Sequence, residues 1–303
     1  MAIPIPTRHD AAVAEGRGER AFPYLLLLPA AVALVLVSIF PLYMGIQASL
    51  THYVFGRAVG GGGFTNYVNV FADQTFWDAM LLTARYVIVV LILETVLGLG
   101  LALLVNRELR FVQFFRMSII APMAVAPVAV GVIWRLMYSS DTGAIDPLFV
   151  ALGQSAPAML AHPDRAFWAL VLVDTWEWTP LLFLLCLAGL QSLPQEPLEA
   201  ARVDGAGPIR VFFEHTLPLL VPVLAVGVVL RLIDAIGTFD QIFVLTRGGP
   251  GTATQLISIY AYNTAFNFNQ YGQGAAMLIS LFVVVFALMM VVVRLMRRSP
   301  AAT

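Results

Sequence analysis

Six long apolar segments separated by polar stretches dominate the chain. They run over roughly residues 22–50, 79–105, 113–138, 166–193, 219–245 and 272–296. A helix of about 20 apolar residues crosses the hydrocarbon core of a bilayer, and each segment is long enough to do so. The first segment is too long for the apolar region of a signal peptide, so we expect it to be retained. The pattern predicts an all-α polytopic membrane protein with six transmembrane helices over residues 21–298, after a polar N-terminal tail at residues 1–20.

The composition supports a membrane protein and excludes several kinds of chemistry. Of the 303 residues, 60% are hydrophobic and 12% are charged, whereas soluble proteins average about 25% charged residues. All 17 basic residues are arginine, so the chain cannot form a lysine-containing phosphate loop or a lysine Schiff base. Cys186 is the one cysteine, which excludes an intrachain disulfide and a cysteine zinc site. We find no basic arm for nucleic acid, no metal-ligand spacing and no cofactor motif.

The placement of arginine predicts the orientation in the membrane. Eleven arginines flank the apolar segments on one side and five on the other. Because the cytoplasmic side is enriched in basic residues, we expect both termini in the cytoplasm. Residues 194–218 then form a cytoplasmic loop, and residues 51–78, 139–165 and 246–271 face outward.

The predicted cytoplasmic loop 194–218 is unusually structured for a connection. Pro194 lies where a helix would begin, since proline at the first turn loses no helical hydrogen bond. Gly205 permits the left-handed conformation that ends a helix, and Pro208 begins a second short helix. Pro218 marks the return to the bilayer. Periodicity alone supports an interfacial hairpin and a rigid docking element about equally.

The motifs in this loop decide between the two readings through a family resemblance. Glu199-Ala200-Ala201, Asp204-Gly205-Ala206 and Leu217-Pro218 resemble the EAA loop of binding-protein-dependent ABC importer permeases. His215 departs from that pattern, where the family usually has isoleucine or valine. Four further stretches, at residues 64–80, 97–110, 187–206 and 239–266, are similar to sugar importer permeases of the maltose-type first subunit.

The resemblance implies a fold, a set of partners and a function. The fold is that of a type I ABC importer permease in the bacterial cytoplasmic (inner) membrane, with no catalytic residue of its own. The loop would couple to one of two separate ATPase subunits, which hold ATP and Mg²⁺. A second homologous permease would complete the translocation path, and an extracytoplasmic solute-binding protein would deliver the substrate. That substrate would be a neutral di- or oligosaccharide, trehalose- or maltose-like, or a polyol.

Charged residues inside the apolar segments need an explanation, because each costs about 2.5–3.5 kcal/mol at mid-membrane. They are Glu94, Asp174, Glu177, Arg231, Asp234 and Asp240. In one continuous helix, Arg231, Asp234, Thr238 and Gln241 would share a face. The hypothetical substrate path therefore comprises Asp174, Glu177, Trp178, Arg231, Asp234, Thr238 and Gln241.

A structural role for these groups is the competing interpretation. Arg231 and Asp234, three residues apart, can neutralise each other and hold helices together. We expect Glu94, alone in its segment, to be a buried hydrogen-bonding residue. Asp174 and Glu177 have no basic neighbour on their helix, which favours a wet pathway for them.

Two other function classes are open to a chain of this composition. An ion-coupled secondary transporter would typically show inverted repeats and paired broken helices, and we detect no repeat. An intramembrane enzyme would need a catalytic dyad. Asp234 and Asp240 are six residues apart, on different faces of a continuous helix, and make a poor one.

Overall fold

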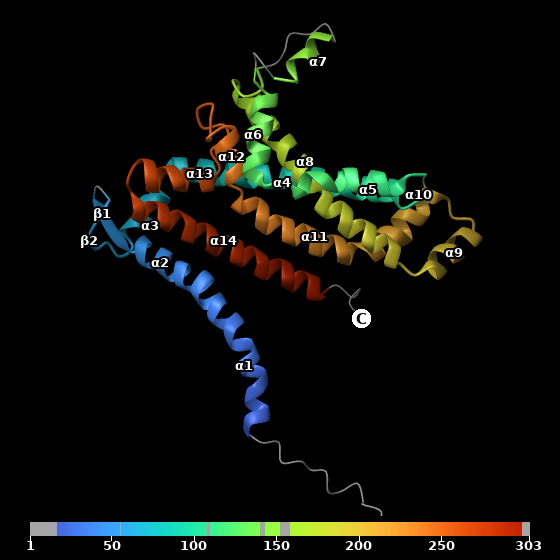
Figure 1. The fold of residues 1–303 in the computed structure, drawn as a ribbon, viewed down its shortest axis with the longest axis horizontal. Coiled ribbons are helices and arrows are strands. Elements are labelled where there is room, and N and C mark those ends of the chain that lie inside the picture. Colours follow the sequence, from blue (N-terminus) through green and yellow to red (C-terminus); the bar gives the residue numbers. More distant parts are fainter. Residues whose placement is uncertain (1–16, 55, 108–109, 140–142, 152–157, 299–303) are drawn as a thin grey trace, which may run out of the picture.

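The computed structural model describes residues 17–298 except 55, 108–109, 140–142 and 152–157 (Figure 1). The described part is a bundle of helices with a two-stranded sheet at one end. The α-helices are α1 (Arg17–Leu34), α2 (Phe40–Ser49), α3 (Thr65–Ala72), α4 (Gln74–Val105), α5 (Val112–Ile120), α6 (Pro127–Met137), α7 (Asp146–Ala151), α8 (Pro163–Ser192), α9 (Gln195–Val203), α10 (Pro208–Val211), α11 (Leu217–Gly237), α12 (Asp240–Leu245), α13 (Ile257–Tyr262) and α14 (Tyr271–Arg298). Short π or 3₁₀ turns, η1 (Val35–Ile39), η2 (Ala121–Ala124), η3 (Phe212–Thr216) and η4 (Asn263–Asn267), extend some of them.

Helices of membrane-spanning length occur where the sequence predicts them. Among the described residues, five segments are long and apolar enough to cross a bilayer: Leu26–Ser49, Gln74–Val105, Pro163–Ser192, Pro208–Gly237 and Tyr271–Val292. A bent pair, Val112–Ala124 with Pro127–Met137, makes a sixth if it counts as one span.

The third segment is not the straight helix that the apolar pattern of residues 113–138 predicts. Its two halves meet at 99°. Pro127 begins the second half, and Ala126 before it is extended, with φ −64° and ψ 137°. The residue before a proline is disfavoured in the helical region because the proline ring crowds it. The prolines at positions 122 and 127 therefore break this span, although its apolar composition is continuous.

The centre of the bundle is the packing of α4 along α8, with α11 against both. A Cβ on Gly98 of α4 would lie 2.9 Å from the Cβ of Leu182 and 2.9 Å from the backbone nitrogen of Phe183. The two helices therefore approach as closely as small residues allow, as is usual for helix pairs in membranes. The core beside this contact includes Ala102, Phe183, Cys186, Leu190 and Leu220.

The first helix stands apart from the bundle. Within this chain, none of the apolar window of Leu26–Ser49 is buried, and α1 projects away from the other helices (Figure 1). The segment is held at its end, where α2 packs on α14. The apolar side chains of this segment that do not face α14 need lipid or another subunit around them.

The one β-sheet among the described residues is a hairpin in the predicted outward loop 51–78. Strands β1 (Thr51–Val54) and β2 (Arg57–Gly61) pair antiparallel. The amide of Asn66 donates to the carbonyl oxygens of Ser49 and Thr51, each at 2.9 Å. These bonds tie the end of α2 to α3, so the loop has a fixed form.

The fifth segment ends earlier than the predicted 219–245. Helix α11 stops at Gly237, and Thr238 has φ −55° and ψ 124°. The short α12 then restarts at Asp240 and packs on α6. Glycine is a poor helix former, and an acidic residue stabilises the first turn of a new helix. The break falls inside the polar face that one continuous helix would carry.

Candidate translocation and coupling sites

Arg231 is the centre of a buried ionic cluster that joins three helices. Its Nε and Nη2 donate to the two carboxylate oxygens of Glu94 on α4, at 2.9 and 3.1 Å. It also pairs with Asp174 of α8, and its Nη1 donates to Asp234, one turn along α11, at 2.7 Å. The side chains of Arg231, Glu94 and Asp174 are fully buried. The cluster therefore ties α4, α8 and α11 together.

This arrangement confirms the two structural roles expected for Glu94 and for the pair of Arg231 and Asp234. Glu94 is a buried hydrogen-bonding residue, as expected, but its partner is the guanidinium of Arg231. The pairing of Arg231 with Asp234 is confirmed and is one part of a larger cluster. A lone acid in one span and a lone base in another suggest such a pair, but the sequence does not show which helices are neighbours.

Asp174 does not lie in a wet pathway in this structure. Besides Arg231, it accepts a hydrogen bond from Nε2 of Gln241 at 2.5 Å. Glu177 is 1% exposed, and its Oε2 is buried without a hydrogen-bond partner among the described residues. The expectation of exposure rested on the absence of a basic neighbour on α8, and the base comes from α11 instead.

The remaining predicted path residues meet at a small cavity beside this cluster. Trp178, Asp234, Thr238 and Gln241 all line it, together with Pro127, Gly237, Phe239 and Asp240. Its volume is about 140 Å³. We call it the polar pocket. Four of the seven predicted path residues are therefore brought together, while Asp174, Glu177 and Arg231 lie behind them or in the core.

The break in α11 changes how the polar pocket is built. The predicted stripe on one continuous helix is wrong, because Thr238 lies in the extended link after Gly237 and Gln241 lies in α12. The residues still converge because the link turns α12 back against α6. The carbonyl of Thr238 accepts a hydrogen bond from Ser258 at 2.7 Å, which holds the link in place.

The chemistry of the polar pocket is that of a site for hydroxyl groups. The side chain of Asp234 is 49% exposed. One of its oxygens binds Arg231, and the other accepts no hydrogen bond from a described residue. The guanidinium of Arg231 lies 5.2 Å from the centre of the Trp178 ring, which fixes that indole by a cation–π contact. The pocket thus offers a carboxylate, a hydroxyl and an aromatic ring beside one another.

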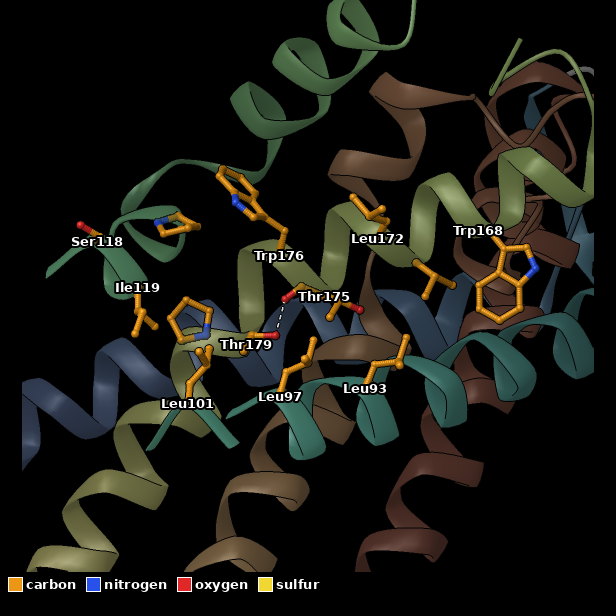
Figure 2. A pocket seen from close by; sticks show the side chains of 13 residues that line it. Leu93, Leu97, Leu101, Ser118, Ile119, Trp168, Leu172, Thr175, Trp176 and Thr179 are labelled. Atoms are coloured by element: carbon orange, nitrogen blue, oxygen red, sulfur yellow. Dashed lines mark hydrogen bonds between the residues drawn. The ribbon is translucent and has the colours of Figure 1, made fainter. Parts of the chain in front are cut away.

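A second groove, wider than the polar pocket, has a different character. It has a volume of about 630 Å³ and lies between α4, α5 and α8 (Figure 2). Leu93, Leu97 and Leu101 of α4 face Trp168, Leu172 and Trp176 of α8 across it. The hydroxyl of Thr179 is used locally, donating to the carbonyl of Thr175 at 2.5 Å. This apolar lining offers little to a hydroxylated solute, and the sequence-based hypothesis did not include it.

The loop 194–218 forms the compact element that its motifs predict. Pro194 precedes α9, and Gly205 after it has φ +85°, in the left-handed region. Leu198 and Ala201 of α9 are buried against Val211 of α10. This small core fixes the angle between the two arms of the loop, so the loop is rigid although it lies at one end of the bundle (Figure 1).

The second arm is not a separate short helix, in contrast to the sequence-based expectation. Helices α10 and α11 run into each other through the π turn η3, as one helical segment from Pro208 to Gly237. Pro218 lies in the first turn of α11. A proline inside a helix removes a hydrogen bond and crowds the preceding turn, and the π turn η3 lies just before Pro218. The second arm of the loop is therefore continuous with α11.

The motif residues divide into a buried and an exposed set. Ala201 is buried, Ala206 is half-buried, and Glu199, Ala200, Asp204, Gly205 and Pro218 are exposed. Leu217 is half-buried at the start of α11. His215, the departure from the family pattern, lines a cavity with Ala200, Asp204 and Glu214. The exposed set is available to a partner protein.

Comparison with known proteins places the chain in a family. The family model of the binding-protein-dependent transport system inner membrane component matches residues 94–299. The trehalose/maltose transport system permease protein of Thermococcus litoralis is 39% identical over 280 residues, covering 92% of this chain and 95% of the relative. The sulfoquinovosyl glycerol transport system permease protein of Agrobacterium fabrum is 33% identical over 286 residues, with 92% of each chain covered.

A solved structure has the same fold. A chain of a bacterial ABC transporter involved in the import of the acidic polysaccharide alginate superposes with a TM-score of 0.81 at 23% identity, covering 93% of this chain and 97% of that chain. The resemblance read from the EAA loop and the predicted type I importer permease fold are both confirmed. The chain belongs to the binding-protein-dependent transport system inner membrane components, and it is a permease subunit of an ABC transporter that has no enzymatic activity itself and depends on a separate ATPase.

Proposed function

We propose that this permease forms half of the translocation path for a neutral di- or oligosaccharide, trehalose- or maltose-like, or for a polyol. The observation that carries the proposal is the polar pocket, where an indole ring, a half-exposed carboxylate and a hydroxyl lie together. Carboxylates accept hydroxyl hydrogens, and an aromatic ring packs against the C–H face of a sugar. The trehalose/maltose relative in Thermococcus litoralis supports the same substrate class.

The charge of the polar pocket argues against an anionic substrate. Asp234 and Asp240 both line it, and Arg231 behind them is already paired with three carboxylates. A second negative charge brought close to these acids would be repelled strongly where water is scarce. Sugars without charge avoid that cost.

The volume of the pocket supports a path shared with a second subunit. About 140 Å³ is small, because pockets that enclose a drug-sized ligand usually measure roughly 300–1,000 Å³. A homologous second permease would supply the facing wall. An extracytoplasmic solute-binding protein would release the sugar into the path from the outer side.

Energy would enter through the loop 194–218. We infer that both termini and this loop are cytoplasmic, and that the exposed motif residues, including Glu199 and Asp204, dock on one of two ATPase subunits that hold ATP and Mg²⁺. Because α10 continues into α11, displacement of the loop on ATP binding would shift α11. That helix carries Arg231 and Asp234, so the shift would reach the buried cluster and the polar pocket together.

The test is uptake by the complete transporter in proteoliposomes, supplied with its solute-binding protein and a panel of radiolabelled solutes. We expect vanadate-sensitive, ATP-dependent uptake of a neutral sugar or polyol, with uronate-containing saccharides failing to compete. The alternative, an ion-coupled secondary transporter, predicts uptake that needs no ATP and is abolished by ionophores. That result, or preferred uptake of an acidic sugar, would refute the proposal.

A further inference from the structure

A cavity at the end of α4 has features that the translocation path does not use. Its volume is about 670 Å³, and it lies between the last turn of α4 and the second arm of the loop 194–218. We call it the basic pocket; its lining includes Leu103, Arg107, Arg202, Ile209, Phe212 and Phe213. None of its lining residues lines the polar pocket.

The basic pocket carries two positive charges that no described residue neutralises. Arg107 and Arg202 are exposed, and neither side chain makes a hydrogen bond or ion pair with another described residue. None of the described residues that line it is acidic. Nearby Arg210 is different, because its Nε pairs with the carboxylate of Glu214 at 2.9 Å. Two guanidiniums that have no partner in the described part of the chain favour a ligand with a negative charge, and the forked donors of arginine suit a phosphate in particular.

The same cavity exposes a large apolar surface. Ile209 is 75% exposed and Phe213 is 61% exposed, and Phe212 and Leu103 complete the apolar part of the lining. Leu103 belongs to the last turns of the span formed by α4. The apolar part therefore reaches the level of the bilayer, and the arginines lie where the span ends. A ligand that satisfies both parts must be an amphiphile.

We propose that the basic pocket binds an anionic phospholipid, with its phosphate between Arg107 and Arg202 and an acyl chain along Phe212, Phe213 and Leu103. Basic pockets between helices at the cytoplasmic surface of membrane proteins suit anionic headgroups. Free inorganic phosphate would satisfy the arginines and leave the aromatic side chains in water. A zwitterionic lipid would satisfy the apolar part and leave net positive charge.

Bound lipid would contact the loop 194–218 as well as the end of α4. Arg202 and Ala206 belong to the loop 194–218, whereas Leu103 and Arg107 belong to the end of α4 and the residues that follow it. A lipid seated between them bridges the loop to α4. The binding claim does not depend on the identity of the transported solute, so it can fail or succeed independently of the proposed sugar import.

The test uses the purified complete transporter, delipidated in detergent and titrated with phosphatidylglycerol or phosphatidylcholine of matched acyl chains. Bound lipid is counted by native mass spectrometry. We expect a phosphatidylglycerol site of higher affinity in the unmodified protein. Each arginine near an anionic headgroup changes affinity roughly fivefold, so Arg107→Gln with Arg202→Gln should weaken this site about 25-fold. Arg210→Gln removes an equal charge from a paired arginine and should leave the site unchanged.

A separate variant tests the apolar half of the site. Phe213→Ser should also weaken phosphatidylglycerol binding, while millimolar inorganic phosphate should not displace the lipid. The proposal is overturned if the double arginine variant binds phosphatidylglycerol normally, if phosphatidylcholine binds equally well, or if phosphate competes. Each variant must still assemble with the ATPase, which is checked by size-exclusion chromatography. The conservative double variant Arg107→Lys with Arg202→Lys should retain most of the affinity for phosphatidylglycerol.

Discussion

Replacing Arg231 by methionine would remove the charge that neutralises the buried cluster and keep most of the volume of the side chain. Glu94 and Asp174, both fully buried, would then face each other without a counter-charge. Removing one partner of a buried ion pair typically costs about 3–5 kcal/mol, because the remaining charge is left uncompensated. Two carboxylates lose their partner here, so we expect a loss near the upper end of that range.

The loss of stability should come more from the uncompensated carboxylates of Glu94 and Asp174 than from the lost attraction to Arg231. A triple variant, Glu94→Gln with Asp174→Asn and Arg231→Gln, removes every charge of the buried part and leaves groups that can hydrogen-bond to one another. Neutral replacements of whole buried ion pairs are often tolerated. We therefore expect the triple variant to recover most of the stability that Arg231→Met loses.

The measurement is reversible unfolding of the purified transporter in mixed micelles of increasing SDS content, followed by tryptophan fluorescence. Arg210→Gln is the matched control, since Arg210 and Glu214 are 68% and 52% exposed and an exposed pair contributes about 0–1 kcal/mol. If Arg231→Met loses no more stability than this control, or if the triple variant is as unstable as the single one, the reasoning fails.

Four further predictions concern the loop 194–218, the topology, the proposed path and Tyr260. Gly205→Val should reduce coupled uptake through about 1–2 kcal/mol of backbone strain, since φ is +85° and the space that a Cβ would occupy has no atom within 4 Å; Gly205→Asn should retain more activity. Single cysteines in a cysteine-free background should be modified by an impermeant reagent from outside at residue 60 and not at residue 204, and labelling at 204 would contradict the orientation. Thr238→Val should lower transport while basal ATP hydrolysis persists, and normal transport would remove this hydroxyl from the path. Burial and a neighbouring carboxylate raise the pKa of Tyr260 to about 12. The contribution of protonated Tyr260 to the free energy of unfolding should therefore be complete below about pH 10 and be lost as the pH rises through about 12. Ultraviolet titration of the protein, compared with that of the Tyr260→Phe variant, measures this pKa.

The site illustrates what a single sequence can predict about buried charges. The rarity of charged residues in apolar segments singled out Glu94, Asp174, Arg231 and Asp234 among others, and these four form one ionic cluster. Which of them pair depended on the packing of α4, α8 and α11, whose neighbours lie as far as 137 residues apart in the chain. Asp174 was therefore expected in a wet pathway, and it lies in the core instead.

The sequence by itself determined the features that follow from local chemistry. Apolar length placed the spanning segments, and the glycine and prolines of the loop 194–218 set its turn, because both effects act within a few residues. The tertiary structure decided the 99° bend of the third span, the break after Gly237 and the convergence of Trp178, Asp234 and Gln241 on one pocket. These features depend on contacts between helices that are distant in the chain, and hydrophobic periodicity is the same whichever neighbour a helix packs against.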